Sequence, residues 1–301
     1  MKLILFYRHV TVLDYAYLDK QLGPMGNSMQ VNVSFYGKTD DEGVVFDFSH
    51  AKKKVKSIID EVCDHRLVVP ATVVSCEREA DKQIEINYSF GKGQRIEYSA
   101  PNEAYFFLSK ESYSHQNLKE DLEKIILKQM PENIERVELE FEEESFSGDK
   151  GHFHYTHGLK QHYGNCQRLL HGHRNTIDFF VEEQENFELE KRLVETFPDR
   201  NIHFAFVENV KNLREVKERF SGQEVMGVAP GESFVVEIEY RSQQGLFNLK
   251  IPSGIVHFVP IETTVENLSA HFANFAKRVL NAPEALTVRA YEGIGKGAIF
   301  S

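Results

Sequence analysis

An internal repeat constrains the fold of this chain more than any other feature. Residues 82–143 and 233–293 present the same order of elements: an alternating strand, a glycine-containing turn, a second strand, a short apolar strand, a helix, a proline-containing turn and a closing strand. The first strands alternate in the same way, at Ile84, Ile86 and Tyr88 and at Val236, Ile238 and Tyr240. This shared order predicts a tandem duplication.

Helical periodicity supports the duplication. The apolar positions of the two helices recur every three or four residues, at Leu118, Leu122, Ile125 and Ile126 and at Leu268, Phe272, Phe275, Ala276 and Val279. Upstream, each copy carries a strand and a helix that precede Asp64-His65 or Asp199-Arg200, and the first of these strands covers residues 43–48. Residues 142–152 are acidic and then rich in serine and glycine, which is typical of a boundary. We therefore expect one unit over 1–146 and a second over 147–301.

Charge and cysteine content limit the partners and the compartment. A net charge of −11 repels nucleic acid and anionic membranes. No apolar run approaches the length of a membrane span, and the first fifteen residues read as a strand rather than as a signal peptide. Three cysteines do not form a disulfide framework, so we expect a protein of the reducing cytoplasm.

The segment 165–175, NCQRLLHGHRN, is the first candidate for chemistry. Residues i and i+2 of a strand face the same way, so His171 and His173 present two imidazoles together. A catalytic zinc takes three protein ligands and keeps one open position. Spacing leaves the third ligand open among four upstream histidines, which are His152, His154, His157 and His162. The alternative interpretation is that His171 and His173 are two surface histidines on an exposed strand. Four further histidines within about twenty residues, and a cysteine five positions before His171, argue against this alternative.

Cys166 also has two interpretations. A lone cysteine is most often a small buried apolar residue. This one lies in a polar, glycine-containing stretch five residues before His171. A nearby divalent cation would favour its thiolate, which can act as a base or a nucleophile. Cys63 lies on the apolar face of a helix and is expected in the core, and nothing marks Cys76 as functional.

Residues 153–159 followed by Cys166 and the His171-Gly172-His173 triplet resemble the zinc site of the 6-pyruvoyl- and 6-carboxy-tetrahydropterin synthase family. The resemblance selects His157 as the third zinc ligand. It extends to Asp64-His65, to Thr264-Val265-Glu266-Asn267, and to Glu292 before a glycine-containing turn. It implies an α+β protein of two tandem tunnelling-fold (T-fold) domains. Each has an antiparallel sheet with helices on one face, and the sheets close into a barrel on oligomerisation.

The resemblance also implies a divided site. The second copy holds the zinc histidines, Cys166 and Glu292, but has Arg200 where the family has histidine. The first copy supplies Asp64-His65, but residues 25–33, MGNSMQVNV, replace the metal-binding triplet. Active sites of the family are assembled between subunits, so two copies that each keep one half are expected to complement each other.

The activity implied is that of a zinc-dependent lyase acting on 7,8-dihydroneopterin triphosphate. Zinc on His157, His171 and His173 would bind the substrate side chain, and Cys166 would act as the general base. His65, held by Asp64, would relay a proton. The substrate-binding residues would be Glu292, Glu266 and Thr264, with Lys160, Arg168 and Arg174 as candidate cations for the triphosphate. The expected partners are the pterin substrate and further copies of the chain. The product, pyruvoyl or carboxy, stays open.

Two alternatives belong to other functional classes. One is a pterin- or zinc-binding protein without turnover, which would need the zinc histidines but neither Cys166 nor His65. The other is a subunit that completes a hetero-oligomer with a one-domain homologue. The enzyme is favoured because every residue type of the family site occurs once across the two copies.

Overall fold

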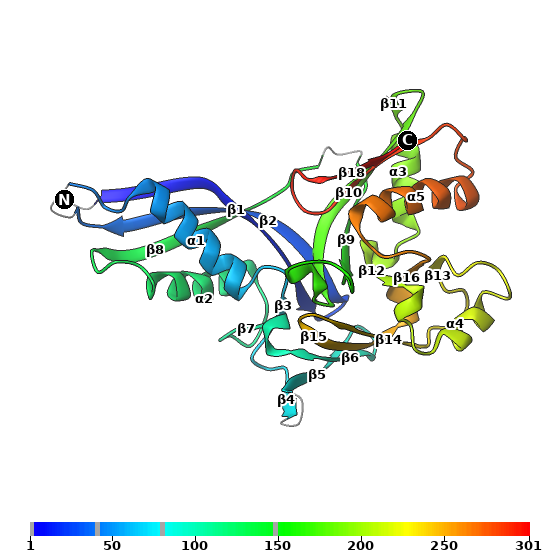
Figure 1. Ribbon diagram of the computed structural model, residues 1–301, viewed down its shortest axis with the longest axis horizontal. Helices are drawn as coiled ribbons and strands as arrows, with labels where there is room; N and C mark the ends of the chain where they lie inside the picture. Colours follow the sequence, from blue (N-terminus) through cyan, green and yellow to red (C-terminus); the bar gives the residue numbers. More distant parts are fainter. Residues whose placement is uncertain (1–2, 40–42, 79–81, 147–149) are drawn as a thin grey trace.

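The computed structural model describes residues 3–39, 43–78, 82–146 and 150–301. The molecule is elongated, with the first copy at one end and the second at the other (Figure 1). The expected boundary at residue 146 borders residues 147–149, which lie outside the described residues. Among the described helices, none has the length and apolar content required to cross a bilayer.

The first copy contains eight strands and two α-helices in the described residues. They are β1 (Leu3–Asp19), β2 (Gly23–Gly37), α1 (Phe48–Val62), β3 (Leu67–Val69), β4 (Ser75–Arg78), β5 (Gln83–Phe90), β6 (Gln94–Pro101), β7 (Tyr105–Phe107), α2 (His115–Leu127) and β8 (Ile134–Glu143). The strand expected over 43–48 is wrong: residues 43–47 form no strand, and α1 begins at Phe48. Phe46 instead packs edge-on against Phe35 of β2, so its apolar character reflects burial without strand pairing.

The second copy repeats this order with additions, including a further short helix. Its elements are β9 (His152–His157), β10 (His171–Val181), β11 (Gln184–Glu185), α3 (Phe187–Glu195), β12 (Asn201–Phe206), α4 (Leu213–Arg219), β13 (Gly227–Val228), β14 (Val235–Ser242), β15 (Gly245–Pro252), β16 (Val256–Val259), α5 (Val265–Val279), β17 (Thr287–Tyr291) and β18 (Gly297–Phe300). The predicted α+β class is confirmed.

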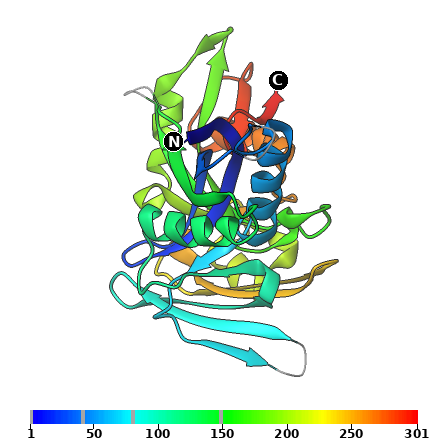
Figure 2. The same cartoon turned by 90° about the vertical axis from the view of Figure 1, so that its left-hand side faces the viewer.

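The sheets reveal how the copies are joined. Each copy has its own sheet, in the order β7-β3-β1-β2-β8 in the first and β13-β16-β12-β9-β10-β17-β18 in the second. A third sheet, in the order β14-β15-β6-β5-β4, takes strands from both copies. There β6 pairs antiparallel with β15, with Tyr98 opposite Leu249 (Figures 1 and 2). The copies are therefore fixed to one another by backbone hydrogen bonds as well as by side-chain packing.

Both helices of the first copy contribute to one core with the same sheet. Val55 and Ile59 of α1 and Leu122 of α2 are fully buried in that core, as their periodicity predicts. In the second copy, Phe272 and Ala276 of α5 are buried likewise, whereas Val279 in the last turn is half exposed. The helices begin at side-chain caps, Asp47 for α1, Ser114 for α2 and Thr264 for α5, which satisfy otherwise unpaired N–H groups.

A buried histidine pair makes the stability of the second copy depend on pH. The Nε2 atoms of His257 and His271 lie 2.8 Å apart, and both residues are almost fully buried. Burial lowers the pKa of His271 to about 4 and that of His257 well below its usual value. The unfolded chain therefore binds more protons below pH ~6.5, and His271 alone costs about 2 kcal/mol of stability at pH 5 relative to pH 7.

We expect His271→Gln, which does not titrate, to reduce the loss of stability between pH 7 and pH 5 by about 2 kcal/mol. Urea unfolding at the two pH values measures this difference. The matched control is His50→Gln, because His50 is exposed. An unchanged loss in the His271 variant would contradict the assignment.

Candidate active site

Three histidines converge at the end of the sheet of the second copy. Antiparallel pairing of β9 with β10 places His157 opposite His171, and His173 opposite Tyr155. All three imidazoles are fully buried, and one ligand atom from each lies within 4.8 Å of the others. The other candidates for the third position point elsewhere. His162 is exposed, His154 bonds to the carbonyl of Gly26 at 2.7 Å, and the ring of His152 stacks on Phe146.

The ring nitrogens indicate that this cluster is built for a metal. Nδ1 of His157 donates to the carbonyl of Thr263 at 3.0 Å, and Nδ1 of His171 to that of Arg168 at 2.6 Å. These bonds fix the tautomers and leave Nε2 of each ring as an acceptor. The Nε2 atoms of His157, His171 and His173 are buried and have no hydrogen-bond partner among the residues that the structure describes. Burial, with the neighbouring histidines, lowers the pKa of His157 and His171, which keeps them in the neutral form that binds metals.

Two glycines bring the first copy against this cluster. A Cβ atom on Gly172 would lie 2.2 Å from the carbonyl oxygen of Tyr155 and 2.7 Å from Cα of Gly26. A Cβ atom on Gly26 of β2 would lie 2.4 Å from the backbone nitrogen of His173. Only glycine at both positions allows β2 and β10 to approach this closely. Gly172 is the middle residue of His171-Gly172-His173. Gly26 is the middle residue of Met25-Gly26-Asn27, the segment of the first copy that stands in place of the histidine triplet.

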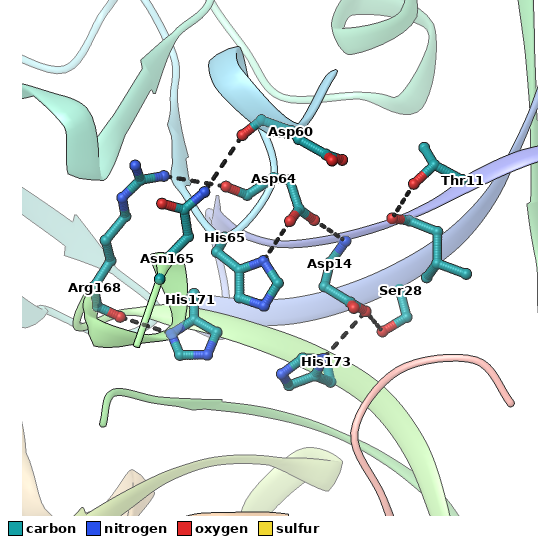
Figure 3. Close-up of polar contacts among 12 residues, drawn as sticks. Thr11, Asp14, Ser28, Asp60, Asp64, His65, Asn165, Arg168, His171 and His173 are labelled. Atoms are coloured by element: carbon teal, nitrogen blue, oxygen red, sulfur yellow. Dashed lines mark hydrogen bonds and ion pairs between the residues drawn. The ribbon is translucent and has the colours of Figure 1, made fainter. Parts of the chain in front are cut away.

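The Asp64-His65 pair of the first copy lies at this contact (Figure 3). The pair follows the C-cap of α1, and His65 has a φ of 55°. Its Nδ1 lies 2.6 Å from Oδ2 of Asp64, and its ring centroid lies 4.9 Å from that of His171. Burial alone would lower the pKa of His65, but hydrogen bonds and charges of Asp64 and Cys166 raise it well above its usual value.

Cys166 completes this arrangement. It lies in a short 3₁₀ turn between β9 and β10, half-buried, and one ligand atom each from Cys166, His65 and His171 fall within 4.8 Å of one another. Asn165 holds the turn against the first copy through the carbonyl of Asp60 at 3.4 Å. The structure thus brings together, in one chain, residues about a hundred positions apart. The other cysteines differ: Cys63 is buried and Cys76 is exposed.

Glu292 approaches the histidine cluster from the end of β17. Its Oε1 lies 3.9 Å from Nε2 of His157 and is buried, with no hydrogen-bond partner in the described ranges of the chain. Thr264 and Glu266 lie at the start of α5, where the Thr264 side chain caps the helix and Glu266 is exposed on the first turn. Thr263, beside them, supplies the carbonyl that orients His157.

Two of the three candidate phosphate-binding cations have structural partners instead. Arg168 is almost fully buried, and its guanidinium donates to the carbonyl of Asp64 at 3.2 Å and to Gln244 at 2.9 Å. Arg174 follows His173 on the strand and donates to the carbonyl of Glu144, because consecutive side chains on a strand face opposite ways. The expectation that Arg168 or Arg174 binds the triphosphate is therefore not supported. Lys160 is exposed.

Sequence reasoning missed Asp14 of β1. Its carboxylate is buried beside His173, accepts a hydrogen bond from Ser28 at 2.5 Å, and pairs with Lys296 at 3.1 Å. Burial would raise the pKa of Asp14, but His173, Lys296 and His65 together lower it below its usual value. The available signal was a single carboxylate within the apolar run Val10 to Leu18.

A family model described as 6-pyruvoyl tetrahydropterin synthase matches residues 17–138 and 149–301. The chain belongs to this family. The two matched segments follow one another, so the protein is a tandem T-fold member of the 6-pyruvoyl tetrahydropterin synthase family, and the expected resemblance and fold class are confirmed.

Solved structures of the same description are similar to about half of the chain. A catalytic-residue variant of the Plasmodium vivax enzyme is 16% identical, covers 48% of this chain and 92% of its own, and has a TM-score of 0.38. The Plasmodium falciparum enzyme is 19% identical, covers 47% and 91%, and has a TM-score of 0.37. At these scores the similarity adds nothing to the family assignment. No curated protein sequence matches the chain.

Proposed function

We propose that this member of the family is a zinc-dependent lyase acting on 7,8-dihydroneopterin triphosphate, with one composite active site per chain. The supporting observation is the convergence of His65 from the first copy with Cys166 and the three buried histidines of the second. A carbon–oxygen or carbon–carbon lyase needs a base and an acid at the same substrate side chain. Cys166 and His65 are suited to these roles, because one ligand atom of each lies within 4.8 Å of a ligand atom of His171.

The histidine cluster fits the metal. His157, His171 and His173 would hold it, because three imidazoles whose buried Nε2 atoms have no hydrogen-bond partner in the described part of the chain match the ligand set of a catalytic zinc. Bound there, zinc would lower the pKa of a substrate hydroxyl and polarise a forming carbonyl. The absence of a carboxylate among the three favours zinc over iron.

The remaining residues have separate tasks. Cys166 would remove a proton from a carbon of the substrate side chain, and His65 would hold and return a proton, with Asp64 fixing its tautomer by the 2.6 Å contact at Nδ1. Glu292 would accept the adjacent N–H groups of the pterin ring, which suit a carboxylate. Thr264 and Glu266 would assist in substrate binding from the start of α5. Of the three cations considered, Lys160 remains the candidate for the triphosphate.

We further expect a homo-oligomer in the reducing cytoplasm. Exposed apolar side chains lie along the first strand, at Ile4 and Phe6, and the edges of open sheets favour association. The three cysteines are free.

Product analysis with 7,8-dihydroneopterin triphosphate tests the proposal. We expect release of triphosphate or carbon–carbon cleavage, about one zinc per chain, and loss of both zinc and turnover in His171→Ala. The control is His162→Ala, because His162 is exposed and lies outside the cluster. Zinc binding without product would identify a non-catalytic pterin- or zinc-binding protein. Turnover that appears only when a one-domain homologue is added would identify a partner subunit.

A further inference from the structure

Asp14 makes contacts that a buried carboxylate in a strand does not ordinarily have. The side chain is 2% exposed, and its Oδ1 lies 3.1 Å from Nδ1 of His173. Ser28 donates to the same oxygen at 2.5 Å, and Nζ of Lys296 lies 3.1 Å from Oδ2. A buried carboxylate is costly unless it is paired, so these partners account for its place in the core.

His173 differs from the other two histidines in what faces its Nδ1. His157 and His171 each donate from Nδ1 to a backbone carbonyl. The Nδ1 of His173 forms no hydrogen bond of good geometry among the described residues, and the Asp14 carboxylate is the ionic partner beside it. Histidines that bind metals through one nitrogen usually donate from the other to a carbonyl or a carboxylate, which fixes the tautomer and the ring orientation.

The backbone of Asp14 reaches the proton-relay pair as well. Its N–H donates to Oδ1 of Asp64 at 3.0 Å, and its carbonyl accepts from the N–H of His65 at 2.6 Å. The turn after Glu292 closes over the side chain, because a Cβ atom on Gly293 would lie 2.6 Å from Oδ1 of Asp14. One residue of the first copy therefore contacts a candidate metal ligand, the Asp64-His65 pair and the turn that follows Glu292.

The internal repeat provides a comparison for this position. β1 pairs with β2 with Asp14 opposite Ser28, and β9 pairs with β10 with His154 opposite Arg174. The second-copy equivalent of Asp14 is therefore His154, which bonds to the carbonyl of Gly26. The carboxylate occurs only at the position that faces the histidine cluster. If the strand itself required a carboxylate at this position, the second copy would carry one there as well.

We propose that Asp14 is a positioning residue of the metal centre: its carboxylate holds the His173 ring with Nε2 toward the metal, and its backbone fixes the Asp64-His65 pair relative to that ligand. This inference rests on the metal site proposed above. It makes the first copy necessary for metal affinity, although all three candidate ligands belong to the second.

The test is zinc affinity of the full chain, measured by competition with a chromophoric chelator. We expect Asp14→Asn to weaken zinc binding by roughly 10- to 100-fold, as is usual when the carboxylate behind a metal-bound histidine is removed. The absorption bands of the Co²⁺-substituted protein should shift as well, because the orientation of one ligand changes. Ser28→Ala, which removes the donor to Asp14 together with the acceptor of a 3.4 Å bond from the backbone N–H of Arg174, should weaken binding by a smaller factor.

Asp121→Asn is the matched control, because Asp121 is a buried, hydrogen-bonded carboxylate of the same copy that accepts from Ser109. It should lower stability and leave zinc affinity and the cobalt spectrum unchanged. Zinc affinity equal to wild type in folded Asp14→Asn would overturn the role of Asp14 and leave the proposed function standing. A wild-type chain that binds no zinc would overturn both together.

Discussion

Replacement of His65 should leave zinc content near wild type and lower turnover by a factor of about 10² or more, the usual cost of losing a positioned acid or base. His65 is not one of the three convergent histidines, yet its ring centroid lies only 4.9 Å from that of His171. The second copy offers no substitute, because the equivalent residue is Arg200, which stays protonated near neutral pH. Metal analysis and steady-state kinetics on the same preparation separate the two effects.

The choice of substitution matters because His65 has a φ of 55°. Alanine at such a position adds backbone strain, whereas asparagine adopts this conformation more readily. Agreement between His65→Ala and His65→Asn would therefore exclude misfolding as the cause. His162→Ala is the control for removing a histidine. Full activity in either His65 variant would show that the composite site is the wrong interpretation.

Mixtures of inactive His65→Ala and inactive Cys166→Ala chains should not regain activity. The structure places both residues within one chain, held by the third sheet, by the contact of Gly26 with Gly172, and by the bond from Asn165 to Asp60. Every chain in the mixture then carries one defective half of its own site. Turnover after co-refolding at equal concentrations measures this directly.

Recovery of activity in the mixture would also have a defined level. If the halves met between subunits, about a quarter of the sites in a random mixture would combine two intact halves, as expected for equivalent interfaces of a symmetric assembly. Differently tagged chains recovered together would prove that the subunits had exchanged. Recovery to that level would contradict the arrangement within one chain.

Local patterns predicted most of the secondary structure, for a physical reason. The periodicity of Val55 and Ile59 in α1, or of Leu268 and Phe272 in α5, records which side of a helix is buried, and that signal is contained in neighbouring residues. The same logic failed at residues 43–47, where Val45 and Phe46 pack against the core of the first copy without pairing as a strand, and Val44 is exposed. A short apolar run reports burial, and burial alone does not distinguish a strand from a packed loop.

Residue order and the fixed period of a strand were enough to predict the duplication, the facing pair His171 and His173, and the presence of one Asp-His pair. Spacing left the third histidine open and the family resemblance selected His157; the folded chain brings His157 to the pair, engages Arg168 and Arg174 elsewhere, and places Asp14 beside His173. The position of His157 follows from the pairing of β9 with β10, whereas that of Asp14 depends on the crossing of β2 and β10 at two glycines and on the sheet shared between the copies. Such contacts link residues more than a hundred positions apart, and no local pattern in the sequence records which distant side chains will meet there.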